Sequence, residues 1–269
     1  MSNLFMRTRL TIQIVFFTIF LAACKKEAVV LPDALITSKT NLTAQFTLLE
    51  QKIAAASAYL IQANMDTTLI RAKLLEVVNQ FPSVVTFSYI TQTGIIRILE
   101  PAVYYGSQGA DISSQDHVVR TFATKMPVLS KQFFAAEGFY ASAYIYPIVN
   151  SNSMKGALSA LFKPESILGN IFKPLNEGQE FELWAIEKGG RLLYDPIASE
   201  IGNNLITDAM YQEFPELVTA VKKFDAEESG TTTFSYYEPG TTHIVKKLAY
   251  WTTFDLNGTE WKLIWSKPE

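Results

Sequence analysis

From residue 83 onward, the sequence passes twice through the same order of hydrophobic patterns, and this duplication limits the possible fold more than any other feature. Each copy begins with two short alternating apolar runs joined by a glycine-containing turn, which is typical of a β-hairpin. A glycine-containing loop, a helical stretch and three more strand-like runs follow in each copy. The pattern predicts an α+β protein with a five-stranded antiparallel sheet and flanking helices, built twice.

The period of two gives the expected strands of each copy. In the first copy they cover residues 85–89, 95–99, 128–135, 139–150 and 155–162, and in the second 181–185, 191–194, 231–237, 244–254 and 260–266. Helices are expected at residues 113–126 and 207–223, at the same place in each copy. Both hairpins end in an acid and a proline, Glu100-Pro101 and Asp195-Pro196.

A strongly helical stretch precedes the first copy. Its apolar residues are spaced alternately four and three positions apart, which places them on one stripe of a helix. The stripe consists of Leu42, Phe46, Leu49, Ile53, Ala56, Leu60 and Ala63. Asn41 is the expected N-cap, and a second helix is expected at residues 69–80. The stripe can form a dimeric coiled-coil seam or pack on its own domain; its short length and its alanines favour the second arrangement.

The first 26 residues have the layout of a bacterial export signal. Arg7 and Arg9 precede an apolar run at residues 10–20, and small residues lead to Cys24, the single cysteine. The pattern resembles a lipoprotein signal, so we expect residues 1–23 to be removed and Cys24 to be acylated. An uncleaved membrane helix is the alternative, but the run is well short of the roughly 20 residues that span a bilayer. Residues 24–40 lack periodicity and are interpreted as a tether.

Composition excludes several classes of function. After residue 23, 21 basic residues stand against 26 acidic ones, so no nucleic-acid partner is expected. The chain has two histidines and lacks zinc-binding spacings, Gly-x-Ser-x-Gly and a phosphate-binding loop, so we expect no enzyme activity, metal or cofactor. Asp195 and Glu200 are interpreted as turn and loop residues.

The long helix and the two repeated units resemble the double Cache fold of bacterial extracellular sensor domains, whose units are PAS-like. The matching segments are residues 109–113, 126–130, 146–148 and 156–161 in the first unit and 186–202 in the second. The resemblance covers roughly residues 42–267. It implies a stalk at 41–80, a first, membrane-distal module at 81–175 and a second module at 176–269.

The resemblance implies extracytoplasmic recognition of a small molecule, usually in the first module, with the second module acting more as a relay. Family receptors continue into a membrane helix and a signalling domain, whereas this chain stops at Glu269. We therefore expect a separate membrane-spanning signalling protein or transporter as partner. Lys25 after Cys24 favours the periplasmic side of the outer membrane, with the inner membrane as the alternative. A structural or interaction lipoprotein, using the apolar stripe or a sheet edge, is the competing function.

The same resemblance implies that the ligand site lies in the first module. The candidate residues are Tyr105, His117, Arg120, Tyr140 and Tyr144. Arg120 offers a planar fork of donors that suits a carboxylate ligand, and His117 lies nearly on the same helix face. Tyrosines suit the wall of a small-molecule pocket, although packing tyrosines, a solvated arginine and a capping histidine are the alternatives. Amino-acid-binding members carry an Arg-x-Trp-Tyr cluster that this helix lacks, so an amino-acid ligand is not expected.

Overall fold

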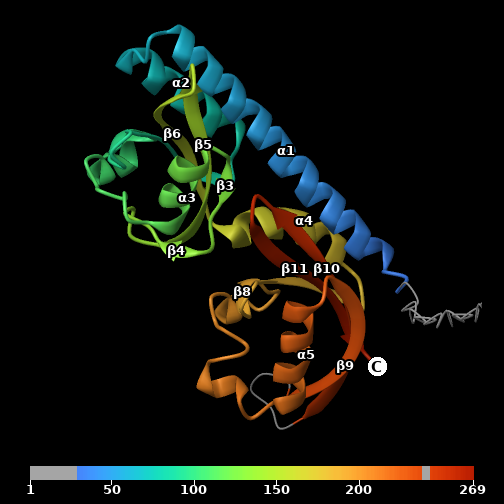
Figure 1. The fold of residues 1–269 in the computed structure, drawn as a ribbon. Coiled ribbons are helices and arrows are strands. Elements are labelled where there is room, and N and C mark those ends of the chain that lie inside the picture. Colours follow the sequence, from blue (N-terminus) through green and yellow to red (C-terminus); the bar gives the residue numbers. More distant parts are fainter. Residues whose placement is uncertain (1–28, 238–242) are drawn as a thin grey trace, which may run out of the picture.

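The computed structural model describes residues 29–237 and 243–269 (Figure 1). The chain is an α+β protein in which a long helix runs beside two antiparallel sheets. The expected signal peptide and the acylated Cys24 lie outside the described residues, so they stay predictions. In the part of the chain that the structure describes, no helix combines the length and the apolar character that crossing a bilayer requires.

Helix α1 (Asp33–Gln62) begins eight residues before the predicted start. Pro32 precedes its first turn, and Asn41 lies in the helix interior, so Asn41 is not an N-cap. The predicted tether is therefore helical in its second half. The buried stripe extends back to Leu35, and Ser38 fills the next buried position with its hydroxyl bonded to the Leu35 carbonyl at 2.8 Å. Because this buried position holds a polar residue, the hydrophobic pattern did not predict the first turns of the helix.

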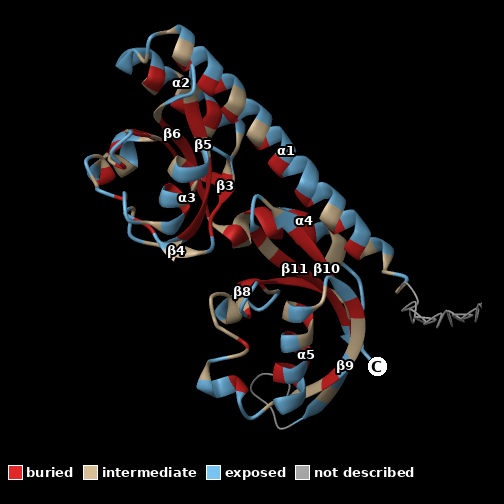
Figure 2. Ribbon diagram, viewed as in Figure 1, coloured by how far each residue is buried: buried red, intermediate tan, exposed pale blue. Residues whose placement is uncertain are grey.

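The apolar stripe of α1 packs on both sheets of its own chain. Six of its seven residues, from Leu42 to Leu60, are buried. Figure 2 shows buried residues recurring along α1 on the side that faces the sheets. They belong to one apolar core that includes residues of both sheets. This stripe is therefore covered by the chain itself and does not offer a coiled-coil seam.

Helix α1 ends in a tight turn. Asn64 and Met65 have positive φ angles of 50° and 56°. Asp66 then caps helix α2 (Thr67–Gln80), because its side chain accepts hydrogen bonds from the amides of Thr68 and Leu69 at 2.9 and 3.0 Å. Helix α2 packs against the first two strands of the first sheet.

The first sheet has six strands in the order β2-β1-β6-β5-β3, with β4 paired separately to β5. Its strands are β1 (Val84–Ile90), β2 (Ile96–Glu100), β3 (Val128–Leu129), β4 (Phe133–Phe134), β5 (Tyr140–Asn150) and β6 (Ser153–Phe162). The single strand predicted at 128–135 is split in two. After Ser130 bonds to Ala143, the chain turns away, and the Gln132 amide donates to Glu187 Oε1 at 2.8 Å.

The second sheet repeats this order with five strands. They are β7 (Glu182–Glu187), β8 (Arg191–Tyr194), β9 (Ser229–Tyr237), β10 (Ile244–Leu256) and β11 (Thr259–Pro268). Their order is β8-β7-β11-β10-β9, so the first, second, third, penultimate and last strands occupy the same places as in the first sheet, and only β4 has no counterpart among the described strands. The predicted duplication is confirmed.

The helical segments differ from the sequence prediction mainly at their starts. They are η1 (Ala102–Ser107), α3 (Asp116–Thr124), α4 (Pro164–Asn176), η2 (Ala198–Glu200), η3 (Ala209–Tyr211) and α5 (Pro215–Ala226). Helix α5 starts later than predicted because the Asn204 side chain accepts hydrogen bonds from the Ile206 and Thr207 amides at 2.9 and 3.1 Å and holds a turn there. Helix α4, which connects the two sheets, was not predicted.

Each sheet is covered on both faces. Helices α1, α2 and α4 pack on one face of the sheets, whereas α3 covers the other face of the first sheet and α5 that of the second. Strand β7 shows the division, because Leu183 and Ala185 belong to the core beside α1 while Trp184 and Ile186 belong to the core beside α5. We call the first sheet with α3 the first module and the second sheet with α5 the second module.

Candidate functional site

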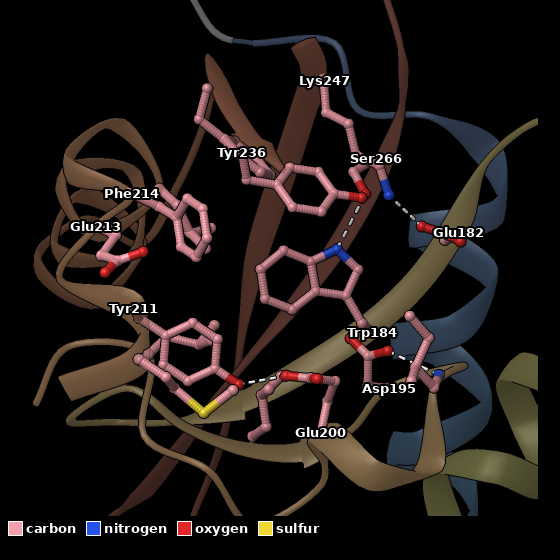
Figure 3. Close-up of a pocket in the computed structure, with 16 residues that line it drawn as sticks. Glu182, Trp184, Asp195, Glu200, Tyr211, Glu213, Phe214, Tyr236, Lys247 and Ser266 are labelled. Carbon is pink, nitrogen blue, oxygen red and sulfur yellow. Dashed lines mark hydrogen bonds and ion pairs between the residues drawn. The ribbon is translucent and has the colours of Figure 1, made fainter. Parts of the chain in front are cut away.

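Each module encloses a hollow between one face of its sheet, its helix and the loop that follows its second strand. The hollow of the first module has a volume of about 20 Å³, roughly enough for one water molecule. The cavity of the second module has a volume of about 530 Å³, which lies in the range of pockets that hold small organic molecules. The second-module cavity, shown in Figure 3, is therefore the candidate site.

Aromatic and aliphatic side chains form most of the wall of the second-module cavity. Trp184 lies on β7, and its indole N–H donates to Ser266 Oγ on β11 at 3.0 Å, which fixes the ring. Tyr211 of η3 and Tyr236 of β9 add two further rings. The remaining apolar lining residues are Leu192, Ile197, Leu205, Met210, Phe214, Leu217 and Phe234.

Backbone hydrogen bonds hold the loop between β8 and α5 in place. This loop contributes many of the lining residues. The Leu192 amide donates to the Asn203 carbonyl at 2.8 Å, and the Leu205 amide donates to the Gly190 carbonyl at 2.9 Å. Gly190 has a φ of 90°, and a Cβ atom there would lie 2.7 Å from Ile206 Cγ1. This loop is therefore a fixed part of the cavity wall.

Charged side chains converge on the second-module cavity from five elements or their adjoining loops. They are Glu182, Asp195, Glu200, Glu213 and Lys247. Lys247 forms an ion pair with Glu182, and its Nζ lies 5.3 Å from the centre of the Tyr236 ring. Among the described lining residues, carboxylates thus outnumber ammonium groups by four to one.

Asp195 and Glu200 are the two carboxylates at the end of β8. Asp195 Oδ1 accepts a hydrogen bond from the Ile197 amide at 2.8 Å. Burial is the largest cause that raises the pKa of Asp195 to about 6, and the nearby Glu182 and Glu200 add to it. Glu200 accepts a hydrogen bond from the Tyr211 hydroxyl. Burial and this bond raise the pKa of Tyr211, so its hydroxyl stays protonated and keeps donating.

Sequence reasoning missed this site. It interprets Asp195 and Glu200 as loop residues and assigns no role to Trp184, Tyr211 or Lys247. One signal was present in the pattern, because Trp184 lies between two apolar residues that share the other face of β7. A bulky aromatic at that position indicates that the opposite face is also covered.

The hollow of the first module is filled by the protein's own side chains. His117 on α3 lines it and is only 5% exposed. Its ring centre lies 4.4 Å from that of Phe133 on β4. Burial lowers the pKa of His117 to about 4, so the ring is neutral at neutral pH and packs as an aromatic side chain.

The other four predicted ligand residues do not line this hollow. Tyr144 is fully buried on the opposite face of the sheet, against Phe46 of α1. The Tyr105 hydroxyl donates to Glu100 Oε1 at 2.6 Å, and Tyr140 is exposed at the start of β5. The structure therefore does not bring the five candidates together around one cavity.

Arg120 connects the two modules. Its Nη1 pairs with Asp116 at 3.4 Å, and its Nη2 donates to the Asn257 carbonyl in the turn between β10 and β11 at 3.1 Å. The Asn257 side chain donates to the Tyr144 hydroxyl at 2.8 Å. Both Arg120 and Tyr144 thus hold this turn of the second module against the first.

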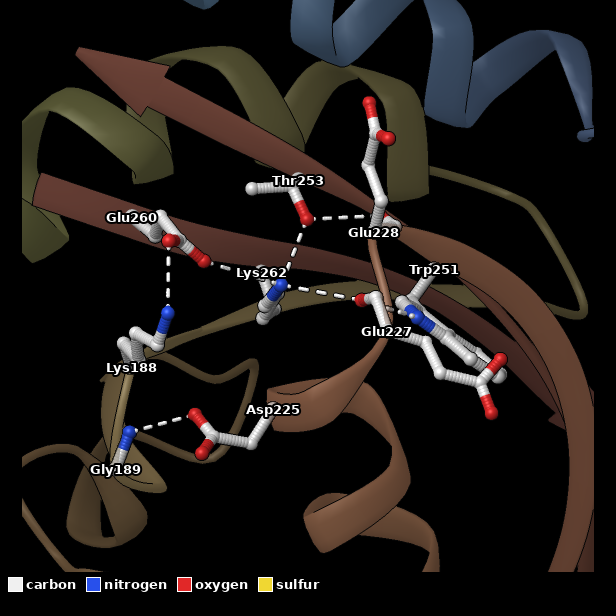
Figure 4. A network of polar contacts seen from close by, with 9 residues as sticks. All are labelled: Lys188, Gly189, Asp225, Glu227, Glu228, Trp251, Thr253, Glu260 and Lys262. Carbon is white, nitrogen blue, oxygen red and sulfur yellow. Dashed lines mark hydrogen bonds and ion pairs between the residues drawn. The ribbon is translucent and has the colours of Figure 1, made fainter.

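A further hollow, of about 500 Å³, lies between α1 and the second sheet and is lined mainly by charged residues. Figure 4 shows the polar contacts of several of them. Lys262, 2% exposed, donates to the Glu227 carbonyl at 3.1 Å and to Thr253 Oγ1 at 2.7 Å, and pairs with Glu260 at 3.4 Å. Its charge is satisfied within the chain, which indicates a structural role. Within residues 29–237 and 243–269, no group of three or more His, Cys, Asp or Glu side chains is placed to hold a metal ion.

The family described as HK/GC/Chemotaxis protein-like, sensor domain, matches residues 44–164. This segment runs from within α1 through the first module to the start of α4. No curated protein matches the chain.

Several solved structures share the fold over most of the chain. An extracellular ligand binding receptor from Desulfohalobium retbaense is 24% identical, with a TM-score of 0.71 over 87% of this chain. This chain spans only 39% of that receptor's length. The ligand-binding domain of the Pseudomonas fluorescens chemoreceptor CtaA, in complex with L-alanine, is 11% identical, with a TM-score of 0.63 over 87% of this chain and 94% of that one.

The ligand-binding domain of the Pseudomonas aeruginosa amino acid chemoreceptor PctB, in complex with L-Arg, gives a TM-score of 0.62 at 11% identity and covers 88% of this chain and 92% of that one. At such identities the likeness establishes the fold. The chain has the double Cache fold of extracellular sensor domains, as its sequence predicts.

Proposed function

We propose that this protein is a lipid-anchored extracytoplasmic sensor that binds a small organic molecule in its second-module cavity. The cavity carries the proposal: it has a volume of about 530 Å³, a largely apolar wall and a few polar groups that converge from separate elements. The fold supports it, because similar structures are an extracellular ligand binding receptor and the ligand-binding domains of chemoreceptors.

The two hollows occupy equivalent places in two copies of one fold, so their volumes can be compared directly. The second module is favoured because its cavity is much the larger of the two. In the first module, the rings of His117 and Phe133 lie in contact, tilted by 36°, and leave about 20 Å³. In the second, the wall is held open by the hydrogen-bonded loop between β8 and α5. A sensory ligand that needs more space than one water molecule fits only the second-module cavity of these two.

The lipid anchor and the envelope location rest on the sequence around Cys24. Lys25 favours the periplasmic side of the outer membrane, and the inner membrane is the alternative. Incorporation of labelled fatty acid into the wild-type protein but not into a Cys24→Ala variant is the measurement that checks the anchor. A separate membrane-spanning signalling protein or transporter is the proposed partner, and ligand-dependent cross-linking to it in whole cells is the corresponding check.

A thermal-shift screen of the mature protein, residues 24–269, tests the proposed ligand site. A compound present at 100 times its Kd should stabilise the folded protein by about 2.7 kcal/mol, which appears as a higher Tm. Leu217→Trp, which places a large ring in the cavity wall, should abolish the shift, and circular dichroism should confirm that the variant is folded. Tyr140→Ala, at an exposed position in the first module, is the matched control and should leave the shift unchanged.

Two outcomes would contradict the proposal. A ligand whose shift survives Leu217→Trp binds elsewhere. A broad screen of amines, carboxylates, sugars and purines that yields no shift would favour the structural or interaction lipoprotein, which then has only sheet edges to use because the α1 stripe is buried.

A further inference from the structure

We infer that the ligand of the second-module cavity is a small organic cation, a protonated amine carried on an apolar or aromatic body, which Asp195 and Glu200 bind by its ammonium group. This inference rests on the proposed function of the cavity and specifies the chemical class of its ligand. It replaces the carboxylate that the sequence suggested for the first module.

The balance of charge in the cavity selects a cation. Four carboxylates and one ammonium group line it among the described residues. Lys247 is already paired with Glu182. Among the described residues, Asp195, Glu200 and Glu213 form no ion pair, so an anionic ligand would face their repulsion in a partly desolvated space.

The geometry of two of these carboxylates leaves room for an ammonium group. Asp195 uses Oδ1 for the Ile197 amide, and Glu200 uses Oε2 for the Tyr211 hydroxyl. In the described structure their second oxygens, Oδ2 of Asp195 and Oε1 of Glu200, accept no hydrogen bond. Figure 3 shows both carboxylates on the same side of the cavity, next to the Trp184 ring. Two acceptors from two fixed residues suit the three donors of a primary ammonium group.

The surrounding rings suit the same ligand. Trp184, Tyr211, Phe214, Phe234 and Tyr236 all line the cavity. The faces of aromatic rings attract cations, and tryptophan does so most strongly. The leucine side chains at positions 192, 205 and 217 complete an apolar space for the remainder of the molecule. An amine with an aromatic or branched apolar body therefore suits both the aromatic rings and the leucine side chains of the wall.

The cavity is poorly suited to a free amino acid. An α-carboxylate needs a cationic or multiple N–H partner, and Lys247, the cation among the described lining residues, is held by Glu182. An amine should therefore bind more tightly than the amino acid with the same side chain. This comparison separates a cation site from a zwitterion site.

Isothermal titration calorimetry on the mature protein with four probes tests the inference. The probes share one phenyl body: 2-phenylethylamine, 2-phenylethanol, 3-phenylpropionate and L-phenylalanine. We expect 2-phenylethylamine to bind about tenfold or more tightly than each of the others, because hydrogen bonds to charged groups are among the strong ones. Its binding should be absent in Leu217→Trp.

Two isosteric variants examine the carboxylates. Asp195→Asn keeps an acceptor for the Ile197 amide, and Glu200→Gln keeps one for the Tyr211 hydroxyl, so both should fold. Each should weaken 2-phenylethylamine about tenfold or more and leave 2-phenylethanol unchanged. Asp255→Asn, an exposed acid of the same module outside the cavity, is the matched control and should alter neither probe.

The outcomes distinguish the inference from the proposed function. If the alcohol, the propionate or L-phenylalanine binds at least as tightly as the amine, and Leu217→Trp removes that binding, the cavity is a ligand site and the cation inference is wrong. An amine whose affinity is the same in Asp195→Asn and Glu200→Gln also overturns the inference. If no probe binds and the wider screen yields no ligand, both the inference and the proposed function fail.

Discussion

At Asp195 the chain keeps a carboxylate where its charge is disfavoured. Burial is the main cause, the carboxylates of Glu182 and Glu200 add to it, and the Ile197 amide and Lys247 oppose it, so that the pKa rises from 3.8 to about 6. The neighbouring Tyr211 stays neutral, because burial, the hydrogen bond to Glu200 and the nearby charge of Asp195 raise its pKa. A group perturbed by burial in a cavity is typical of a functional site.

Asp195→Asn should therefore stabilise the ligand-free protein at neutral pH. The pKa of Asp195 is higher in the folded than in the unfolded chain, so the wild-type protein loses stability as the pH rises from about 4 through about 6. Asparagine does not titrate and escapes this loss. In thermal denaturation, the Tm of Asp195→Asn minus that of the wild type should be small near about pH 4 and increase towards about pH 8.

Asp255→Asn provides the reference, because its carboxylate is exposed on the same module. Its Tm difference from the wild type should show no comparable rise with pH. A difference for Asp195→Asn that is flat or that falls with pH would mean that the cavity does not disfavour the charge.

At the scale of single elements, β6 approaches β1 so closely that only glycine fits at one position. Gly156 has a φ of 129°, and a Cβ atom there would lie 2.3 Å from the Ile90 carbonyl oxygen and 2.7 Å from Tyr89 Cε2. Gly138, in the turn before β5, has a φ of 90° and open space around the same position. The two glycines therefore share the backbone constraint but differ in their neighbours.

Gly156→Ala should destabilise the protein more than Gly138→Ala does. Both substitutions strain a positive φ, but the first also forces the strands apart, which costs about 1–3 kcal/mol more. Urea denaturation of the two variants and the wild type gives the difference in the free energy of unfolding. Equal losses would show that the strands separate without cost and that only the backbone angle matters.

The elements also show which parts of the fold the sequence can predict. The α1 stripe and most strands follow from local periodicity, because a single face of each is buried. The split between β3 and β4 does not, since it depends on a hydrogen bond from Gln132 to Glu187, which lies 55 residues later in the chain. The start of α1 was missed because Ser38, a polar residue, occupies a core position.

At the scale of the whole molecule, one side chain of α1 joins the two modules. The Phe46 ring lies 6.3 and 5.6 Å, centre to centre, from Tyr144 and Phe162 of the first sheet. It lies 5.5 and 5.8 Å from Phe254 and Trp261 of the second sheet. The two modules therefore share one core through α1.

Phe46→Ala should destabilise the protein by about 3–5 kcal/mol, the usual cost of removing a buried phenylalanine. Because the lost ring joins both modules, calorimetry should show one unfolding transition for the wild type and a broadened or divided transition for the variant. Leu48→Ala, at a position of the same helix that is 48% exposed, is the control and should change the stability by less than about 0.5 kcal/mol. A similar small loss for Phe46→Ala would mean that the modules are joined elsewhere.

The position of the proposed ligand site is the property of the whole molecule that the sequence could not predict. Both modules follow the same pattern of strands and helices, and the resemblance to sensor domains directs attention to the first. The modules differ because the contacting rings of His117 and Phe133 fill one hollow, whereas Trp184, held by Ser266, borders an open one. Such packing depends on side chains from many separate segments, which periodicity does not bring together.

Helix α1 has 30 residues without a break, so it is a rod of about 45 Å. Its first turns lie beside the second module and its last turns beside the first (Figure 1). Both sheets pack on this one helix, so a ligand that moved the second sheet relative to α1 would disturb a core that the first sheet shares. Ligand binding in the second module would thereby affect the packing of the first module, at the other end of the helix.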